Sequence, residues 1–474
     1  MTPNPNDYAD TTRTIGTRIG ELSYVGGYPS DDTIRRACDQ LDLQRATQAY
    51  LEFIPFMSSQ ALFDSQGTLL RENRDVGVFD HQAKGKADWV GLTFNTESIY
   101  CSANVNVEHG PVVIETPPNV LGVIDDGWMR YITDIGNVGP DRGAGGSYVL
   151  VHDDFDGEVP GGSFVFRTPT YMNWVMARAF VDDTGEGARA LDWYRANFRI
   201  HPLGAEPDPD AAYVPLSEHP LDCTHARDLR YFERLAEVVQ YEPSGAFTSY
   251  ELGLLKAIGI ERGRPFEPDE RMRALLAEGI EIGDAIAKAN AYASRLDGVR
   301  AYLDRKFEYL FVGGRHDFMS GDALWLDARL LFHYEAIVVT PAMASEMVGA
   351  GSQYLTCYRD ADDHFLMGEH TYRLHLPPHI PAANFWSVTA YHPETRSLLA
   401  NGTAQPSRNS YEQLRWNEDG SIDLYFGPTA PDGYEQNWIR TLPDQGWSIF
   451  LRLYGPLESF FDKTWKPDDL VRCD

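Results

Sequence analysis

Polar side chains stand directly in front of a strand-forming run at residues 95–118, NTESIYCSANVNVEHGPVVIETPP. Asn95 can bind a substrate, Glu97 can take up a proton and Tyr100 can donate one. Asn and Glu also suit a turn that leads into a strand, so the sequence leaves a structural role open for Asn95 and Glu97. The stretch therefore predicts either one side of a reactive site or the turn that starts a strand.

Acid–base chemistry, either hydrolysis or elimination, is the reaction that the polar residues of the predicted strands could support. It needs a carboxylate base, a proton donor and a cation that holds an anionic substrate group. The candidate catalytic residues are Glu97, Tyr100, Asp134 and Tyr148. The candidate substrate-binding residues are Asn95, Arg167, Trp386, Tyr391, Trp438 and Arg452. In this hypothesis a carboxylate is the base, a tyrosine donates the proton and an arginine holds the anionic group.

Arg452 lies in the apolar run WSIFLRLYGP, where alternation places it on the face of Phe450 and Tyr454. If this face is buried inside the β-sandwich, the guanidinium must be paired or open onto a polar pocket, because an unpaired buried charge costs several kcal/mol. If the face is outward, the two aromatic residues shield the aliphatic stem of the arginine. The sequence leaves both arrangements open.

Four histidines cluster in HFLMGEHTYRLHLPPH, namely His364, His370, His375 and His379. Neutral imidazoles at such short spacing could bind zinc, iron or copper. However, strand alternation places His370 and His375 on opposite faces, and two prolines redirect the chain before His379. The pattern favours scattered histidines of a sheet and its turns. We therefore expect no cofactor, with a metal on these histidines as the alternative.

The five cysteines are few, odd in number and widely spread, and no two of them have CxxC spacing. Neither a disulfide framework nor a zinc ribbon is indicated. Cys101 shares the apolar face of Ile99, opposite Tyr100, and has no Lys or Arg beside it in the sequence. We expect a buried, unreactive thiol at this position.

The overall composition excludes several classes of function. A formal net charge of −29 disfavours nucleic acid and anionic membrane surfaces as partners. No run approaches the roughly 18 apolar residues of a membrane span, and the first residues have no apolar segment of a secretory signal. The expected location is the cytoplasm, and the expected partner is a small-molecule ligand, with homo-oligomers possible in principle. GxSxG, HExxH, Walker and GxGxxG motifs are all absent from the sequence.

The elements that would position these residues are mainly strands. Period-two runs separated by Gly, Pro and Asp clusters lie between residues 76 and 167 and again from about residue 353. Helical spacing predicts a helix from residue 34 that stops or kinks at Pro55. Further helices are predicted for TYMNWVMARAFV, for GARALDWYRANFRIHPL and across the middle of the chain, where residues 269–311 form one long helical pattern.

The predicted fold class is mainly β with helical segments, in which two antiparallel β-sandwich modules of jelly-roll-like type are joined by a helical insert. The predicted divisions are a helical lead-in at 1–75, an N-terminal β-sandwich module at 76–210, a helical linking segment at 211–335 and a C-terminal β-sandwich module at 336–474.

Several motifs resemble a known family. NTESIYCSANVNVEHGP, DIGNVGPDRGAGGSYVLV and FRTPTYMNWVMARAFV resemble the N-terminal module of the DUF1254/DUF1214 two-domain proteins. FWSVTAYHPETRSLLANG, GSIDLYFGPTAP, NWIRTLP and GWSIFLRLYGPLESFFDKTWKPDDL are similar to the C-terminal module, and KAIGIERGRPFEPD to the linking segment. The resemblance implies two β-sandwich modules with helical elements between them. It implies no activity, and where many members carry Asn-Asp-Thr this chain has Thr96-Glu97-Ser98.

The functional hypothesis is an enzyme, a hydrolase or lyase, that acts on a small organic molecule in a cleft between the two modules. The alternative is a protein that binds carbohydrate or another ring-bearing ligand on its C-terminal aromatic residues without catalysis. A scaffold that serves only oligomer assembly is the third possibility. The first hypothesis expects Asn95, Tyr100 or Asp134 to approach residues 385–391 or 438–452.

Overall fold

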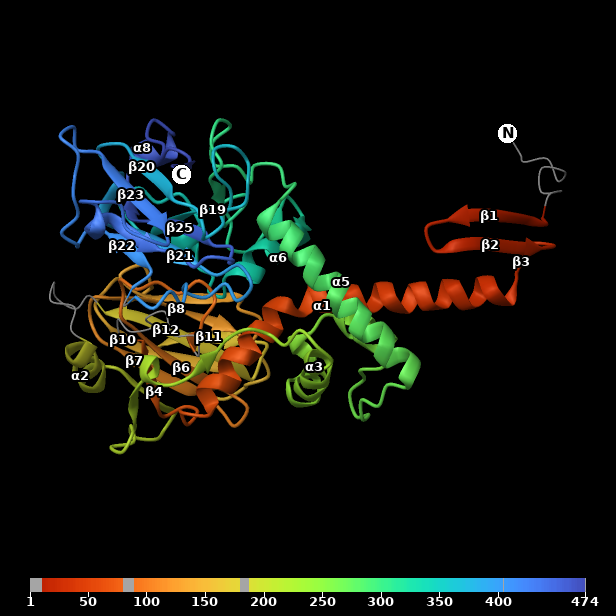
Figure 1. Cartoon of the computed structure of the whole chain (residues 1–474). Coiled ribbons are helices and arrows are strands. Elements are labelled where there is room, and N and C mark those ends of the chain that lie inside the picture. The colour runs from red at the N-terminus through yellow and green to blue at the C-terminus, as the bar shows by residue number, and fades with distance from the viewer. Residues whose placement is uncertain (1–10, 80–88, 180–186, 404, 474) are drawn as a thin grey trace. The chain divides into compact units, whose positions relative to one another are not determined.

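A computed structural model of the chain describes residues 11–79, 89–179, 187–403 and 405–473 (Figure 1). It divides into two compact units. The smaller unit consists of Met1–Phe53 and Ala226–Ala287, and the larger one of Ile54–His225 and Lys288–Asp474. The described chain is mainly β, with several sheets, eight α-helices and no barrel, as the sequence predicts for the overall class.

The smaller unit combines a short β-ribbon with helices. The ribbon has the strand order β1-β2-β3 and lies beside the first turn of α1 in Figure 1. Its elements are β1 (Arg13–Thr17), β2 (Gly20–Val25) and β3 (Tyr28–Pro29). The helices are α1 (Asp31–Gly67), α3 (Arg230–Tyr241), η3 (Ser244–Ala246), α4 (Ser249–Ala257) and α5 (Glu270–Tyr292), of which α1 and α5 end in the larger unit.

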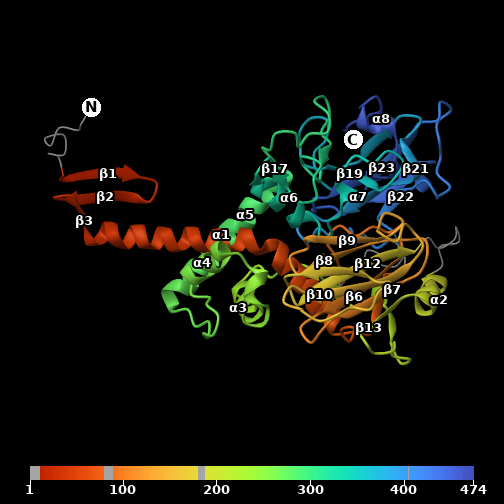
Figure 2. The same ribbon diagram turned by 180° about the vertical axis from the view of Figure 1, so that it is seen from behind.

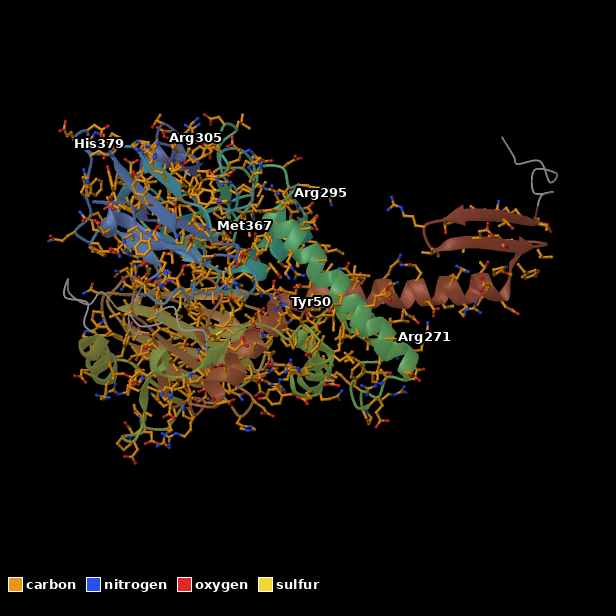
Figure 3. The ribbon with its side chains drawn as sticks, in the orientation of Figure 1. Tyr50, Arg271, Arg295, Arg305, Met367 and His379 are labelled. Atoms are coloured by element: carbon orange, nitrogen blue, oxygen red, sulfur yellow. The ribbon has the colours of Figure 1, made fainter. Side chains whose placement is uncertain are left out.

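Two contacts fix α5 against α1 within the smaller unit. A Cβ atom on Gly283 would come within 2.4 Å of the ring of Tyr50, which Figure 3 labels, so the absence of a side chain permits the close approach. Arg271 on α5 forms ion pairs with Asp39 and Asp42 on α1. Both helices are therefore held side by side by a close contact and by surface ion pairs.

The helix that begins after Ser30 continues past Pro55. Of the two outcomes predicted at that residue, a stop or a kink, the stop is wrong. Ser30 does cap the helix, because its Oγ accepts the backbone N–H of Thr33 at 3.3 Å. The helix continues to Gly67 through side chains that are fully buried, among them Ile54 and Phe56. Tertiary burial of this segment outweighs the one backbone hydrogen bond that proline removes.

The N-terminal module of the larger unit contains two main sheets. The six-stranded sheet has the order β14-β4-β6-β12-β8-β9 and the four-stranded sheet the order β11-β10-β7-β13. The strands of the first are β4 (Val76–Phe79), β6 (Tyr100–Asn106), β8 (Val120–Asp126), β9 (Tyr131–Gly136), β12 (Met172–Ala179) and β14 (Tyr213–Pro215). Those of the second are β7 (Val112–Thr116), β10 (Gly146–His152), β11 (Phe164–Thr168) and β13 (Arg199–Pro202), and β5 (Trp89–Val90) pairs with β15 (Leu221–Asp222).

Within the stretch TYMNWVMARAFV, Met172–Ala179 form strand β12 and not the predicted helix, and the last two residues lie outside the described ranges. The strand lies between β6 and β8, with which it pairs along its full length. Its residues alternate between two environments, since Val175 and Ala177 face one core and Trp174 faces another. The side-chain environments therefore alternate with a period of two, as in a strand. The sequence did not show this clearly because the residues of this run are also compatible with a helix. The following segment is helical as predicted over α2 (Gly187–Asn197), before β13 begins.

The middle of the chain is helical in part. The patterns at α3 and α4 are helices as predicted, but the long pattern at 269–311 ends with α5 at Tyr292. The sequence RLDG that follows forms a turn with Gly298 at a φ of +77°, and this turn signal outweighs the apolar spacing beyond it. The remaining elements are η2 (Leu216–Glu218), β16 (Glu308–Tyr309), β17 (Met319–Ser320), β18 (Ala323–Leu324), α6 (Leu326–Glu335) and α7 (Pro341–Ala344).

The C-terminal module also contains two main sheets, with the orders β16-β19-β25-β21-β22 and β24-β23-β20-β26. The first includes β19 (Ser352–Cys357), β21 (Ala382–Tyr391), β22 (Ser407–Asn409) and β25 (Ser448–Pro456). The second includes β20 (Tyr372–Leu376), β23 (Ile422–Gly427), β24 (Trp438–Arg440) and β26 (Val471–Arg472), with η4 (Glu435–Asn437) and α8 (Glu458–Phe461) nearby in the chain. The sheets are not purely antiparallel, because β10–β11, β4–β14, β5–β15 and β23–β24 pair in parallel.

Three large hydrophobic cores and a small cluster around Val113, Val149 and Val151 lie in the described part of the larger unit. One contains side chains from the six-stranded and four-stranded sheets of the N-terminal module, and a second contains side chains from both sheets of the C-terminal module. The third joins the modules, since it combines Val123 and Trp174 of the six-stranded sheet with Tyr391 and Phe450 of the C-terminal module. Figure 2, the view from behind, shows the sheets of the C-terminal module stacked on those of the N-terminal module. No helix in the described ranges is long and apolar enough to cross a membrane.

Candidate functional site

Residues of both modules line a small, partly open cavity beside their shared core. Its volume is about 60 Å³, which holds a few water molecules or a very small ligand and lies far below the roughly 300–1,000 Å³ of drug-sized sites. The polar side chains that line it are Tyr100, Asp134, Arg178, Thr340, Ser352, Tyr354 and Tyr454. The apolar ones are Leu121, Val123, Met176, Val338, Ala342 and Met343.

Alternation along the strands brings these groups together. On β6, Cys101, Ala103 and Val105 point into the N-terminal core, so Tyr100 points away from it toward the cavity. On β25, Leu451 and Leu453 point into the C-terminal core, so Tyr454 points to the opposite side. Each module therefore presents the second face of one sheet to the same cavity.

Asp134 on β9 is the acidic group of the cavity, and only 6% of it is exposed. Its Oδ1 accepts the hydroxyl of Thr340 at 2.6 Å, and its Oδ2 accepts the hydroxyl of Tyr131 at 3.2 Å. Burial raises the pKa of Asp134 to about 6, although these two hydrogen bonds oppose the shift. Among the described residues, none forms an ion pair with this carboxylate. It therefore exchanges a proton near neutral pH.

Asp125 on β8 is a second buried carboxyl behind Asp134. It is fully buried, its Oδ2 accepts the backbone N–H of Val339 at 3.2 Å, and its Oδ1 has no hydrogen-bond partner. Burial raises the pKa of Asp125 well above its ordinary value, and the charges of Asp126 and Asp134 act in the same direction. Burial therefore disfavours the charged form of Asp125, as it does that of Asp134.

Asn95 connects the two modules through phenol groups. Its Nδ2 donates to the hydroxyl of Tyr100 at 3.0 Å and to the hydroxyl of Tyr454 at 2.8 Å, while its Oδ1 accepts the backbone N–H of Ser98. Asn95 thus has the structural turn role and also positions two hydroxyls at the cavity. The partner in the C-terminal module is Tyr454, which lies just outside the expected ranges 385–391 and 438–452.

The loop before Asn95 anchors to a buried arginine of β25. Arg452 is 2% exposed, and its Nη2 donates to the backbone oxygen of Thr93 at 2.6 Å. Tyr391 donates to the backbone oxygen of Phe94 at 2.7 Å, and the guanidinium lies 5.4 Å from the Tyr391 ring centre. Of the two arrangements open for Arg452, the buried one is confirmed. Arg452 and Tyr391 hold the loop that carries Asn95 and do not line the cavity.

Arg178 on β12 is the cation that lines the cavity. It is 7% exposed, its Nη1 lies 3.5 Å from the hydroxyl of Ser98, and its guanidinium lies 5.4 Å from the ring centre of Tyr454. A guanidinium in this position can hold the anionic group of a ligand. Glu97, in contrast, is half-buried beside the site, where it accepts the hydroxyl of Thr96 at 2.7 Å and does not line the cavity.

Four of the candidate residues lie away from the cavity. Tyr148 is buried in the N-terminal core and donates to Asp141 at 2.8 Å. Arg167 is exposed on β11 and donates to three backbone oxygens of the loop at 152–155. Trp386 is buried in the C-terminal core, and half-buried Trp438 donates to the backbone oxygen of Gly427. Each of these four residues therefore makes packing contacts or hydrogen bonds within its own module and none of them lines the cavity.

The histidine cluster does not converge on one point. His375 is hydrogen-bonded to Asp423 at 2.9 Å, His364 is exposed near Asp360, and His379 is exposed. In the described ranges no group of three or more His, Cys, Asp or Glu side chains is arranged to hold a metal ion. Cys101 is fully buried, as its place on the apolar phase of β6 predicts, and burial raises the pKa of its thiol.

Sequence reasoning missed Arg178, Thr340 and Tyr354. A signal existed for two of them. In MNWVMAR an alternating interpretation places Arg178 on the face of Met176, and Thr340 followed by Pro341 has the pattern of a helix cap. Thr340 caps α7, since its Oγ1 accepts the backbone N–H of Ala342 at 3.1 Å while donating to Asp134. Nothing in the sequence distinguishes Tyr354 from other strand tyrosines.

The two modules match two protein families. Residues 76–202 match DUF1254 and residues 351–458 match DUF1214, each described as a protein of unknown function. The chain is a DUF1254/DUF1214 two-domain protein. In this DUF1254/DUF1214 protein the cavity is formed by residues of both matched ranges together with residues 338–343 between them. No curated protein matches the chain in sequence.

Two solved structures show similarity to the DUF1254/DUF1214 protein. The VPA0106 protein from Vibrio parahaemolyticus is 18% identical with a TM-score of 0.54, over 91% of this chain and 100% of that one. A putative uncharacterized protein from Burkholderia cenocepacia is 14% identical with a TM-score of 0.42, over 92% of this chain and 96% of that one. The first shares the fold over nearly the whole chain.

Proposed function

We propose that the protein is an enzyme, a hydrolase or lyase, that performs acid–base chemistry on a small anionic organic molecule in the cavity between its two modules. The observation that carries the proposal is the placement of buried Asp134 at a cavity that Arg178 and three tyrosines also line. A titrating carboxyl, a cation and hydroxyl donors around one cavity are the parts that such a reaction needs.

The roles follow from the contacts of each group. Asp134 takes up and returns a proton, because a carboxyl whose pKa is raised to about 6 is largely ionised at pH 7 yet still basic. Tyr100 donates a hydrogen bond or a proton to the reacting oxygen, oriented by Asn95. Arg178 holds the anionic group. Thr340 and Tyr131 fix the carboxylate, so they are positioning residues.

The size of the cavity supports a substrate of a few non-hydrogen atoms, such as a short carboxylic or hydroxy acid. A sugar ring would exceed a space of about 60 Å³. The aromatic platform that carbohydrate binding needs is also weakly supported, because Trp386 and Trp447 are 4% and 2% exposed.

We interpret each pair of sheets as a jelly-roll-like sandwich. We also propose a cytoplasmic location, because all five cysteines are free thiols.

The test is turnover and thermal stabilisation of the full chain with a panel of short carboxylic acids, hydroxy acids and their esters. We expect one or more to raise the unfolding temperature and to be converted. Asp134→Asn should lower kcat by on the order of 100-fold, while Asp154→Asn, whose side chain is 93% exposed, is the matched control and should not. Stabilisation without conversion would favour a binding protein. If no compound stabilises the chain and none is converted, the proposal is wrong.

A further inference from the structure

The β-ribbon at the start of the smaller unit has no covering layer within the described chain. None of the residues of β1, β2 or β3 is buried. Its large apolar side chains Ile15, Val25 and Tyr28 are 40%, 68% and 81% exposed. Its contact with the helix below is polar, through the backbone N–H of Ser23 to Thr33. A three-stranded sheet needs an apolar face packed against another layer for stability, so this ribbon lacks part of its packing.

A groove of about 550 Å³ lies on α1 in the same unit. Leu41 and Leu51 of α1 line it together with Tyr250 of α4 and Ile282 and Ile286 of α5. Four of these five are well exposed, with Leu41 at 50%, Tyr250 at 61%, Ile282 at 38% and Ile286 at 42%. The apolar surface of the groove is therefore open, and it has the size of a ligand site. Arg45 is the one charged residue among those that line it.

The charge of both surfaces sets them apart from the rest of the chain. The chain carries a net charge of −29, yet no Asp or Glu lines the groove. The ribbon segment 11–30 contains Arg13 and Arg18 against Glu21, which makes it slightly positive. Two copies of so acidic a chain repel each other over most of their surfaces. The ribbon and the groove, which Arg45 lines, are two surfaces without an excess of acid. A contact between them therefore avoids the acid–acid repulsion that opposes association elsewhere.

We propose that a second copy of this chain occupies the groove, with the ribbon of each copy packed into the groove of the other. A two-fold dimer covers the ribbon and the groove of both copies, because an isologous contact uses the same pair of patches twice. The proposal is independent of the cavity between the modules. The same contact predicts the register of the two α1 helices. The ribbon ends next to residue 30 and the groove on α1 spans residues 40–51, so residue 30 of one copy should lie opposite about residue 46 of the other, with the two-fold axis near residue 38.

Cys38 provides a direct measurement of that register. It is exposed on α1, and the only other exposed cysteine is Cys473. In the full chain with Cys473→Ser, mild oxidation or a short bis-maleimide should link Cys38 of the two copies into a covalent dimer. The link should disappear when Cys38→Ser is added. A chain that forms a dimer without any such link would have another interface, and the proposal would be wrong.

Sedimentation of the full chain at micromolar concentration is the primary test, with a dimer as the expected result. The ribbon variant Val25→Asp/Tyr28→Asp and the groove variant Ile282→Glu/Ile286→Glu should each raise the dimer dissociation constant at least tenfold. All four positions are exposed, so each variant should keep the parent's circular dichroism. The control is Leu303→Glu, at a side chain that is 100% exposed in the larger unit, and it should leave the dimer unchanged.

Mixing the two variants separates this contact from any other dimer. The ribbon variant retains an intact groove and the groove variant retains an intact ribbon, so one of the two contacts is restored in the mixed dimer. The mixture should therefore dimerise more tightly than either variant alone. A monomeric parent, variants with unchanged dissociation constants, or a mixture no tighter than its components would each overturn the proposal. So would a monomeric parent that binds phosphatidylcholine vesicles, which would assign the face to lipid.

Discussion

The two faces of the six-stranded sheet differ in chemistry although the same strands build both. Toward the N-terminal core, Cys101 and Ala103 on β6 and Val175 and Ala177 on β12 form a continuous apolar surface. On the opposite face the same two strands place Tyr100, Ser102, Asn104, Trp174 and Arg178. An apolar face needs only a complementary layer. A buried polar face needs a partner for every donor and acceptor, so it specifies its neighbours much more strongly.

The polar face is sealed at one end and open at the other. At the sealed end Ser102 accepts the indole N–H of Trp174 and the amide of Gln66, and Asn104 donates to the backbone oxygen of Phe63. At the other end the hydroxyl of Tyr100 and the carboxylate of Asp134 reach the cavity. One face of a single sheet therefore changes from a structural network to a candidate reactive site. Substitutions on either face of the sheet test this difference.

The largest effect is expected on the apolar face. Val175→Asp would place an ionisable group without a partner at a fully buried position in the N-terminal core. We expect the free energy of unfolding to fall by at least about 4 kcal/mol, measured by urea denaturation. The neighbouring Met176→Gln, on the opposite face beside the cavity, is the control and should cost about 1 kcal/mol or less. Equal losses at both positions would show that the two faces do not differ as described.

An intermediate effect is expected at Arg452, where the second module meets the loop of the first. Arg452→Met removes the shorter of two hydrogen bonds to the buried backbone oxygen of Thr93 and leaves only the one from the Tyr391 hydroxyl at 3.4 Å. The expected loss in the free energy of unfolding is about 1–3 kcal/mol, and ligand binding at the cavity should weaken because the loop carries Asn95. The exposed Arg167→Met is the comparison, since it should change the unfolding free energy by less than the buried substitution. A loss below about 0.5 kcal/mol for Arg452→Met, as at a surface site, would contradict its anchoring role.

An effect of similar size, but dependent on pH, is expected at Asp134. Its pKa is raised from 3.8 to about 6 in the folded protein, so the folded state binds this proton more tightly than the unfolded state. The stabilisation is complete below about pH 4 and is lost as the pH rises through 6, by an amount of about 2–3 kcal/mol. Asp134→Asn removes this dependence. The unfolding free energy of the variant relative to the parent should therefore rise between pH 4 and 7, measured by urea denaturation across that range. A constant difference between the two proteins would mean that the carboxyl titrates normally.

The sequence predicted the mainly β class and the apolar phase of β6, because both depend on short-range alternation that side-chain types record directly. It placed Asp134 and Tyr100 among the site candidates because polar side chains concentrate in the motifs that resemble the family. It did not predict β12, since TYMNWVMARAFV contains residues compatible with a helix and only the neighbouring strands β6 and β8 decide its conformation. The candidates Tyr148 and Arg167 lie on the other sheet, a distinction that depends on strand order and not on local pattern.

The smallest effect concerns Cys101, where the contrast between the faces predicts an absence of reaction. Cys101, Cys223 and Cys357 are buried, and burial raises the pKa of each thiol, which suppresses the thiolate that attacks iodoacetamide. Cys38 and Cys473 are exposed. Mass spectrometry of the native protein at neutral pH should therefore find two labelled thiols, and five after unfolding in urea. Rapid labelling of Cys101 in the folded protein would place it on the cavity face, and the assignment of Tyr100 to that face would fail with it.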